Sequence, residues 1–119
     1  MSLDFYDKSG KPYAYSDDGQ TIYTFDGAPI AFLDGDSIYG FDGRHVGYFH
    51  NNAILDPSGN TLLFTDGAIG GPMKPMKQMK TMKGMKQMPP MKGMKQMKPM
   101  KPMFSMGWSQ LTPNAVFGS

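Results

Sequence analysis

Short hydrophobic runs alternate with polar interruptions along the first 70 residues, and a turn signal appears about every eight residues. The runs are rich in aromatic and β-branched residues, as in 21–25, 30–33 and 46–49, which is typical of strands. Several interruptions are Asp-Gly pairs, such as Asp26-Gly27 and Asp42-Gly43, which favour hairpins with type I′ turns. We therefore predict eight short antiparallel strands in meander order, without a helix of normal length.

The runs also repeat. Residues 23–32 and 39–48 share the pattern aromatic-x-Phe-Asp-Gly-x-x-aliphatic-small-aromatic at an offset of 16, a third unit follows at the same offset, and a looser one precedes them. Four such hairpins can close around a pseudo-fourfold axis, which leaves no sheet edge exposed. The repeat predicts an all-β domain whose core is shared by the aromatic residues Tyr6, Tyr13, Tyr15, Tyr23, Phe25, Phe32, Tyr39, Phe41, Tyr48, Phe49 and Phe64.

Beyond residue 72 the period changes to three. Met stands at every third position from Met73 to Met106, and Lys follows most of these methionines, at Lys74, Lys77, Lys80, Lys83, Lys86, Lys92, Lys95, Lys98 and Lys101. An α-helix would turn each Met ~60° from the last, and a strand needs a period of two. Polyproline II has three residues per turn and would align Met on one ridge and Lys on the next. We therefore divide the chain into an all-β domain (1–68), a Gly/Pro hinge (69–72), a period-three tail (73–106) and an anchor segment (107–119).

Charge separates the same two halves. Residues 1–70 contain ten Asp against Lys8, Lys11 and Arg44, a balance of −7, whereas residues 71–119 contain nine Lys and no acid. A basic tail commonly has an anionic partner, and here the acidic head of the same chain is one candidate.

The tail has two interpretations. It is a disordered polycation, or it is an ordered polyproline II segment whose Met ridge is buried; the strict period favours the second. At ~3.1 Å per residue the tail is too long to lie straight across its head, so it must wrap, double back or meet other chains. The predicted interaction ridge is Met76, Met79, Met82, Met85, Met88, Met91, Met94, Met97 and Met100, and the predicted anchors are Phe104 and Trp108.

The hairpin unit, the period-three basic tail and the ending 104–109 (FSMGWS) together resemble the bacterial four-fold β-flower proteins. The resemblance extends over nearly the whole chain. It implies hairpin petals around a pseudo-fourfold axis, and it implies no activity, ligand or catalytic residue.

The residues that could carry catalysis or bind metal form no recognisable arrangement. Cys is absent, and His45 and His50 are expected on opposite faces of one strand. Asp34, Asp36 and Asp42 do not follow the calcium-loop pattern. We expect no enzyme activity, no cofactor, no metal site and no small-molecule substrate.

The favoured function is therefore structural: a protein-interaction module that self-associates, or binds another protein, through the tail. The first alternative is that the basic tail recruits the head to nucleic acid or an anionic membrane. A minor alternative is Cu(I) binding by Met-x-x-Met, because thioethers prefer soft cations. The first ten residues lack the apolar run of a signal peptide, and no stretch approaches the ~20 apolar residues of a membrane span, so a cytoplasmic location is the default expectation.

Overall fold

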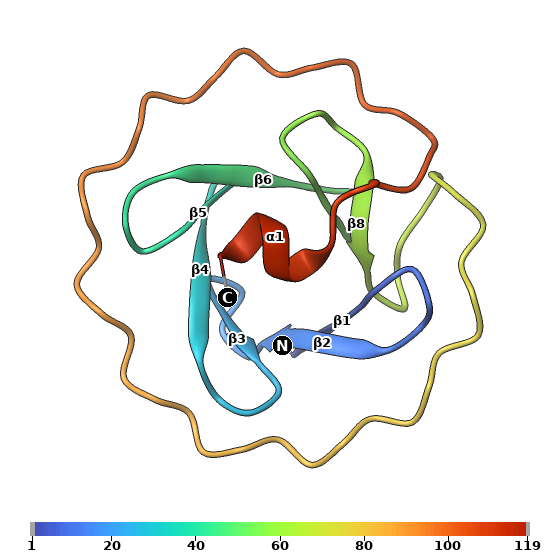
Figure 1. Ribbon diagram of the computed structural model, residues 1–119, viewed down its shortest axis with the longest axis horizontal. Helices are drawn as coiled ribbons and strands as arrows, with labels where there is room; N and C mark the ends of the chain where they lie inside the picture. The colour runs from blue at the N-terminus through green and yellow to red at the C-terminus, as the bar shows by residue number, and fades with distance from the viewer. Residues whose placement is uncertain (1, 119) are drawn as a thin grey trace.

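A closed eight-stranded antiparallel barrel forms the first half of the chain. The computed structural model describes residues 2–118. Each strand pairs with the next, and β1 also pairs with β8, so the sheet has no free edge (Figure 1). The predicted all-β meander of four hairpins is confirmed. Its strands are β1 (Leu3–Tyr6), β2 (Pro12–Ser16), β3 (Thr21–Thr24), β4 (Pro29–Asp34), β5 (Ser37–Tyr39), β6 (His45–His50), β7 (Ala53–Leu55) and β8 (Thr61–Phe64).

Apart from Phe5, the strands carry small and aliphatic residues on the inside of the barrel. Because side chains alternate along a strand, the neighbour of each inward residue points outward. The inward set has almost no exposed surface: Phe5, Ala14, Ile22, Ala31, Ile38, Ile54 and Leu63. The outward set, which we call the outer belt, is aromatic except for one leucine, and is also buried: Tyr6, Tyr15, Tyr23, Phe32, Tyr39, Tyr48, Leu55 and Phe64.

Eight of the eleven aromatic residues predicted to share the core are buried, but they do not fill the inside of the barrel. Most of the aromatic residues lie on the outer wall, where rings from adjacent strands pack in pairs, such as Tyr15 on Tyr23 at 5.8 Å and Phe32 on Tyr39 at 5.9 Å between centroids. The physical reason is space, because an eight-stranded barrel is just wide enough inside for side chains to fill it. An aromatic outer wall in turn needs a cover of its own.

Four wide turns, which join β1–β2, β3–β4, β5–β6 and β7–β8, share one hydrogen-bond pattern. In the β5–β6 turn, Gly43 N–H donates to the Gly40 carbonyl at 3.0 Å, and Gly40 N–H donates to the Arg44 carbonyl at 2.9 Å. The other three wide turns form the same two bonds, around Gly10, Gly27 and Gly59. The hairpin repeat seen in the sequence is thus a repeat of turn geometry.

The type I′ prediction for the Asp-Gly pairs is wrong. A type I′ turn needs positive φ at both central residues. Gly27 and Gly43 have φ of 100° and 92°, but the only non-glycine residues described with positive φ are Asn51 and Asn52, in the narrow β6–β7 turn. In the wide turns the glycine alone is left-handed, and the strand register shifts in the preceding strand, between Ile22 and Tyr23 and between Ile38 and Tyr39, as in a bulged hairpin.

The tail encircles the barrel. In Figure 1, which looks down the shortest axis of the molecule, residues 73–105 form a wavy outer ring around all eight strands. This stretch contains neither helix nor strand. Of the routes that its length allowed, the chain takes the wrap around its own head; the polyproline II assignment stays a prediction.

After the ring, the chain turns inward and covers one end of the barrel. Gly107 and Ser109 form backbone hydrogen bonds with Thr61 at 3.0 and 2.7 Å, so Trp108 pairs in parallel beside β8. A short helix α1 (Pro113–Phe117) follows, and Val116 joins the inner core. Thr112 caps this helix, Pro113 begins it and Gly118 ends it in the left-handed conformation.

Candidate functional site, a methionine rim on a lysine clasp

The ring is attached to the barrel through its backbone. The amides of Gln78, Gln87, Gln96 and Ser105 donate to the carbonyls of the four turn glycines, Gly10, Gly27, Gly43 and Gly59, at 2.8–3.0 Å. These donors are nine residues apart, so nine residues of ring span one hairpin unit. Gly84 and Gly93, also nine apart, donate to Phe25 and Phe41 at 2.7 Å. The corresponding places in the first and last quarters are Pro75 and Pro102, which have no amide hydrogen.

The turn glycines are required by this close approach. A Cβ on Gly27 or Gly43 would overlap the carbonyl oxygen of Met85 or Met94, and a Cβ on Gly84 would overlap that of Asp26. Glycine is therefore selected at these turns twice, by its positive φ and by the ring that lies against it.

The lysines point inward onto the outer belt. Lys83 Nζ lies 4.2 Å from the ring centroid of Tyr15, and Lys92 Nζ lies 4.4 Å from that of Phe32. A second series with the same nine-residue spacing lies over tyrosines at 5.5–5.8 Å: Lys77 over Tyr6, Lys86 over Tyr23 and Lys95 over Tyr39. Each pair is a cation–π contact, and the aliphatic stems bring apolar surface to the belt.

Carboxylates beside the belt form ion pairs with six of the tail lysines. Lys80 Nζ lies 2.9 Å from Asp4, Lys86 lies 3.0 Å from Asp17, and Lys95 lies 2.5 Å from Asp34. Within residues 2–118, the ion pairs are Lys77–Asp66, Lys80–Asp4, Lys83–Asp4, Lys86–Asp17, Lys95–Asp34 and Lys101–Asp36. Three tail lysines remain. Lys74 and Lys98 donate to the backbone carbonyls of Gly70 and Asp34, and Lys92 lies over the aromatic ring of Phe32. The acidic head is therefore the partner of the basic tail.

Titration of these pairs gives a testable pH dependence. Hydrogen bonds from Lys86, Lys95 and Lys101 lower the pKa of Asp17, Asp34 and Asp36 below the ordinary 3.8. The ion pairs therefore stabilise the docked ring above the ordinary Asp pKa and are lost as pH falls through the lowered values. The same partners raise the pKa of Lys86 and Lys95 above 10.5, so the pairs are also lost as pH rises through those raised values.

We expect the ring amides to exchange faster with solvent below about pH 4 than at pH 7, after correction for the intrinsic pH dependence of exchange. The amides to follow by NMR are those of Gln78, Gln87 and Gln96, with the inner-strand amide of Ile38 as the control. Equal protection factors at both pH values would show that stacking and backbone bonds alone hold the ring.

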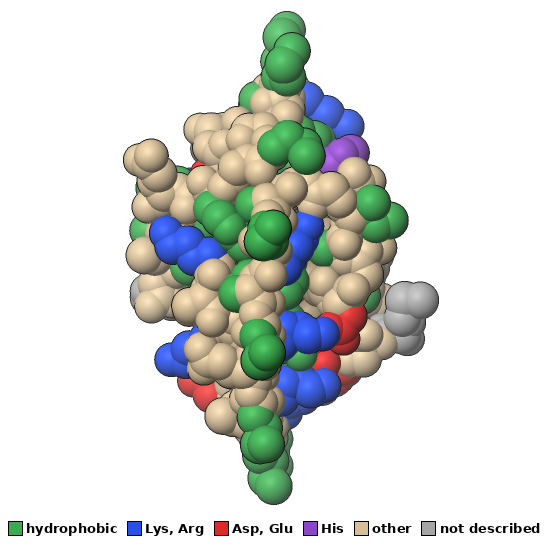
Figure 2. Space-filling view, turned by 90° about the vertical axis from the view of Figure 1, so that its right-hand side faces the viewer, with side chains coloured by type: hydrophobic (Ala, Val, Ile, Leu, Met, Phe, Trp, Pro, Cys, Tyr) green, Lys and Arg blue, Asp and Glu red, His purple; other side chains and the backbone are tan. Residues whose placement is uncertain are grey.

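The methionines point outward. We call the twelve of them, every third residue from Met73 to Met106, the methionine rim. The nine predicted ridge residues, Met76 to Met100, are each between 90% and 95% exposed, and Met106 is 69% exposed. In Figure 2, which views the molecule edge-on, hydrophobic side chains protrude along this rim while blue lysines lie beside it against the head.

The prediction that the Met ridge is buried is therefore wrong for the single chain. The outer belt is tyrosine-rich and bordered by Asp, so it matches a lysine better than a thioether. Sequence reasoning recognised the period of three but missed the nine-residue spacing in its third position, where Gln78, Gln87 and Gln96 recur. That spacing, set against the 16-residue head repeat, was the signal that each quarter of the tail docks on one hairpin.

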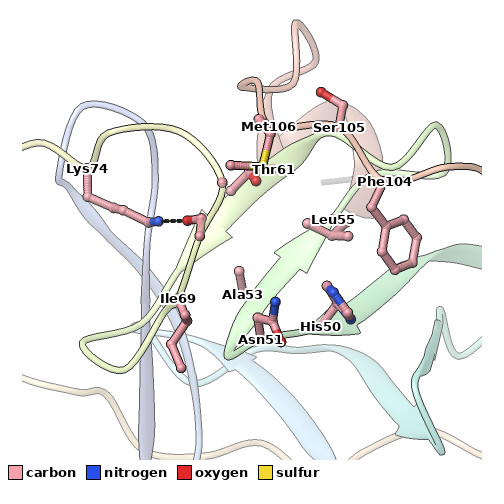
Figure 3. Close-up of a pocket in the computed structure, with 12 residues that line it drawn as sticks. His50, Asn51, Ala53, Leu55, Thr61, Ile69, Lys74, Phe104, Ser105 and Met106 are labelled. Carbon is pink, nitrogen blue, oxygen red and sulfur yellow. Dashed lines mark hydrogen bonds between the residues drawn. The ribbon is translucent and has the colours of Figure 1, made fainter.

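The predicted anchors lie where the ring ends. Phe104 stands nine residues after Lys95 and takes the place of the next lysine; its ring centroid is 5.4 Å from Tyr48 and 4.8 Å from His50. Trp108 packs edge-on against Phe64 at 6.0 Å. A cavity of about 170 Å³ remains where the two ends of the ring meet, between Phe104 on one side and Ile69 on the other, over Ala53 and Leu55 (Figure 3).

The groups weighed for metal binding are separated in the structure. His45 Nε2 is 3.2 Å from the Ser37 hydroxyl and its ring packs between Tyr39 and Tyr48, whereas His50 lies against Phe104. Within residues 2–118, no group of three or more His, Cys, Asp or Glu side chains could hold a metal ion. No helix in that range is long and apolar enough to cross a bilayer.

A family model described as "4-fold beta flower protein" matches residues 3–117. The chain belongs to this family. No curated protein and no solved structure matches the chain significantly. The family description names an architecture and no activity. In this beta flower the architecture consists of four hairpins, and successive nine-residue stretches of the tail bind successive hairpins.

Proposed function

We propose that this beta flower is a non-enzymatic structural module that associates with further copies of itself through the methionine rim. One observation carries the proposal. The tail turns its lysines inward and exposes twelve thioethers, the reverse of what a tail needs in order to stay solvated. Exposed apolar surface of this extent marks an interaction site, and Met is the side chain best able to adapt to varied partner surfaces.

The shape of the rim indicates what kind of assembly forms. The ring backbone that carries the rim is convex and encircles the barrel (Figure 1), so one neighbour covers only a sector of the rim. Contacts between different sectors of two copies are heterologous, and such contacts lead to open arrays unless the rotation closes. We therefore expect assembly that grows with concentration, without a single defined dimer.

The ion pairs between tail lysines and head aspartates weigh against the alternative that the tail binds nucleic acid or an anionic membrane. Phosphate binding requires free ammonium groups, and six of the nine tail lysines already pair with carboxylates of the head. Nothing in the outward geometry favours Cu(I) over a protein contact. The two main hypotheses differ in salt dependence, because binding to phosphates weakens steeply with salt whereas apolar burial persists.

The test is sedimentation velocity over a concentration series at low and high salt. Met79, Met82, Met88 and Met91 are changed together to Gln, and the matched control changes the same four residues to Leu. We expect the wild type and the Leu variant to associate at both salt concentrations, and the Gln variant to associate at least about tenfold more weakly, a loss of about 1.4 kcal/mol. A wild type that stays monomeric throughout would refute the proposal, and salt-sensitive binding to a DNA duplex or anionic vesicles would support the polycation alternative.

A further inference from the structure

The rim methionines differ from ordinary methionines in that they support nothing in the fold. Within residues 2–118, the ring is held by backbone hydrogen bonds, by lysine and glutamine side chains, and by the anchors Phe104 and Trp108, with no hydrogen bond or ring contact from a methionine side chain. The Met76, Met85 and Met94 backbones lie against turn glycines, but their side chains are more than 90% exposed. The chemistry of the thioethers can therefore change without disturbing the structure beneath them.

Oxidation is the reaction open to an exposed thioether. Hydrogen peroxide transfers one oxygen atom to the sulfur: the O–O bond breaks, an S=O bond forms, the sulfur loses two electrons and water leaves. The product, methionine sulfoxide, is polar and is returned to the thioether by dedicated reductases. The chain has no Cys to react first, and its single Trp is partly covered by Phe64.

We propose that the methionine rim is a reversible oxidation site, where peroxide-class oxidants convert the apolar rim into a polar one while the clasped barrel stays intact. The second part of this proposal rests on the proposed function: oxidation dissociates the associated copies, and reduction allows them to associate again. An oxidation site buried in a core would unfold the protein; this one changes only the surface that the protein presents.

The modification is tested first, at a dilution where the protein is monomeric. Folded protein is treated with hydrogen peroxide and followed by intact mass and peptide mapping. We expect up to twelve added oxygen atoms on the described methionines, at rates within about twofold of those of the urea-denatured chain. Thermal midpoint and tryptic protection at Lys77, Lys83 and Lys95 should remain unchanged. Methionines that react much more slowly in the folded chain, or a tail that becomes trypsin-sensitive, would overturn the proposal.

The switch is tested second, by sedimentation of oxidised and reductase-treated protein at associating concentrations. We expect oxidised wild type to dissociate and repaired protein to associate again. The control replaces all twelve rim methionines with Leu, which keeps the rim apolar and removes the reactive sulfur; it should associate with or without peroxide. If that control also dissociates after peroxide, another residue is responsible and the switch is refuted. Absence of association before oxidation refutes the proposed function alone, since the mass and proteolysis results judge the oxidation site separately.

Discussion

Gly43→Ala should release the ring from one petal, whereas Gly19→Ala should leave it in place. Both glycines have positive φ, 92° and 74°, so an alanine at either is strained by about 1–2 kcal/mol. They differ in surroundings: a Cβ at Gly19 meets nothing within 4 Å, but a Cβ at Gly43 overlaps the Met94 carbonyl oxygen. That overlap adds about 1–3 kcal/mol unless the ring moves away.

The measurements are denaturant unfolding and a trypsin time course. We expect Gly43→Ala to lower the free energy of unfolding by about 1–3 kcal/mol more than Gly19→Ala. Trypsin should cut at Lys92 and Lys95 in the Gly43 variant while Lys77 stays protected. Gly27→Ala is the replicate, with cutting moved to Lys83 and Lys86. Equal stability and equal cutting in the Gly19 and Gly43 variants would mean that the ring does not depend on the turn glycine.

Each repeat in the sequence carries a different kind of structural information. The 16-residue offset between residues 23–32 and 39–48 predicted the hairpins and their closure, because turn chemistry and alternation are local properties. The opposite charges of the two halves indicate that the head can pair with the tail. Lys80, Lys86 and Lys95 of the tail do form ion pairs with aspartates of the head.

What the sequence did not predict is which face of the tail points inward. Hydrophobicity alone favours Met against the head and Lys in solvent. In the structure the lysine ammonium groups lie against the head, with side chains still 34–56% exposed in the ion pairs, and the Met side chains point into solvent. The decision is made by the outer belt, whose tyrosines present π faces next to carboxylates, as with Tyr15 and Tyr23 beside Asp17. That surface exists only after the barrel has closed, so no window of tail sequence could reveal it.

The helix α1 was also missed, although its signals are present. Thr112 before Pro113 and Gly118 after Phe117 are an N-cap, a first-turn proline and a left-handed C-cap. At five residues the helix is too short to be stable by itself. Its stability must come from packing against the barrel end that it covers, where Val116 joins the inner core.

Val116→Asp should open that end of the barrel. Val116 is 6% exposed and belongs to the inner core, while the helix is fastened by the stacked rings of Tyr13 and Phe117 at 6.1 Å and by Arg44, which donates to the Val116 carbonyl at 3.3 Å. A carboxylate in place of the valine loses its hydration against apolar neighbours, so α1 must leave the barrel or the aspartate must be protonated. We expect a loss of about 3 kcal/mol or more.

Ala115→Asp is the matched control, because Ala115 lies on the exposed side of the same helix. There the new charge stays in water near the helix N-terminus, and the change in the free energy of unfolding should stay within about 0.5 kcal/mol. Thermal unfolding gives the stability difference, and amide exchange at Gly118, which donates to Asn114 at 2.8 Å, reports whether α1 is docked. If both variants are equally stable, the helix does not support the barrel. If only Val116→Asp loses stability while the ring amides of Gln87 and Gln96 keep their protection, helix α1 and the ring stabilise the barrel independently. The methionine rim can then be studied in a variant whose helix α1 is not docked.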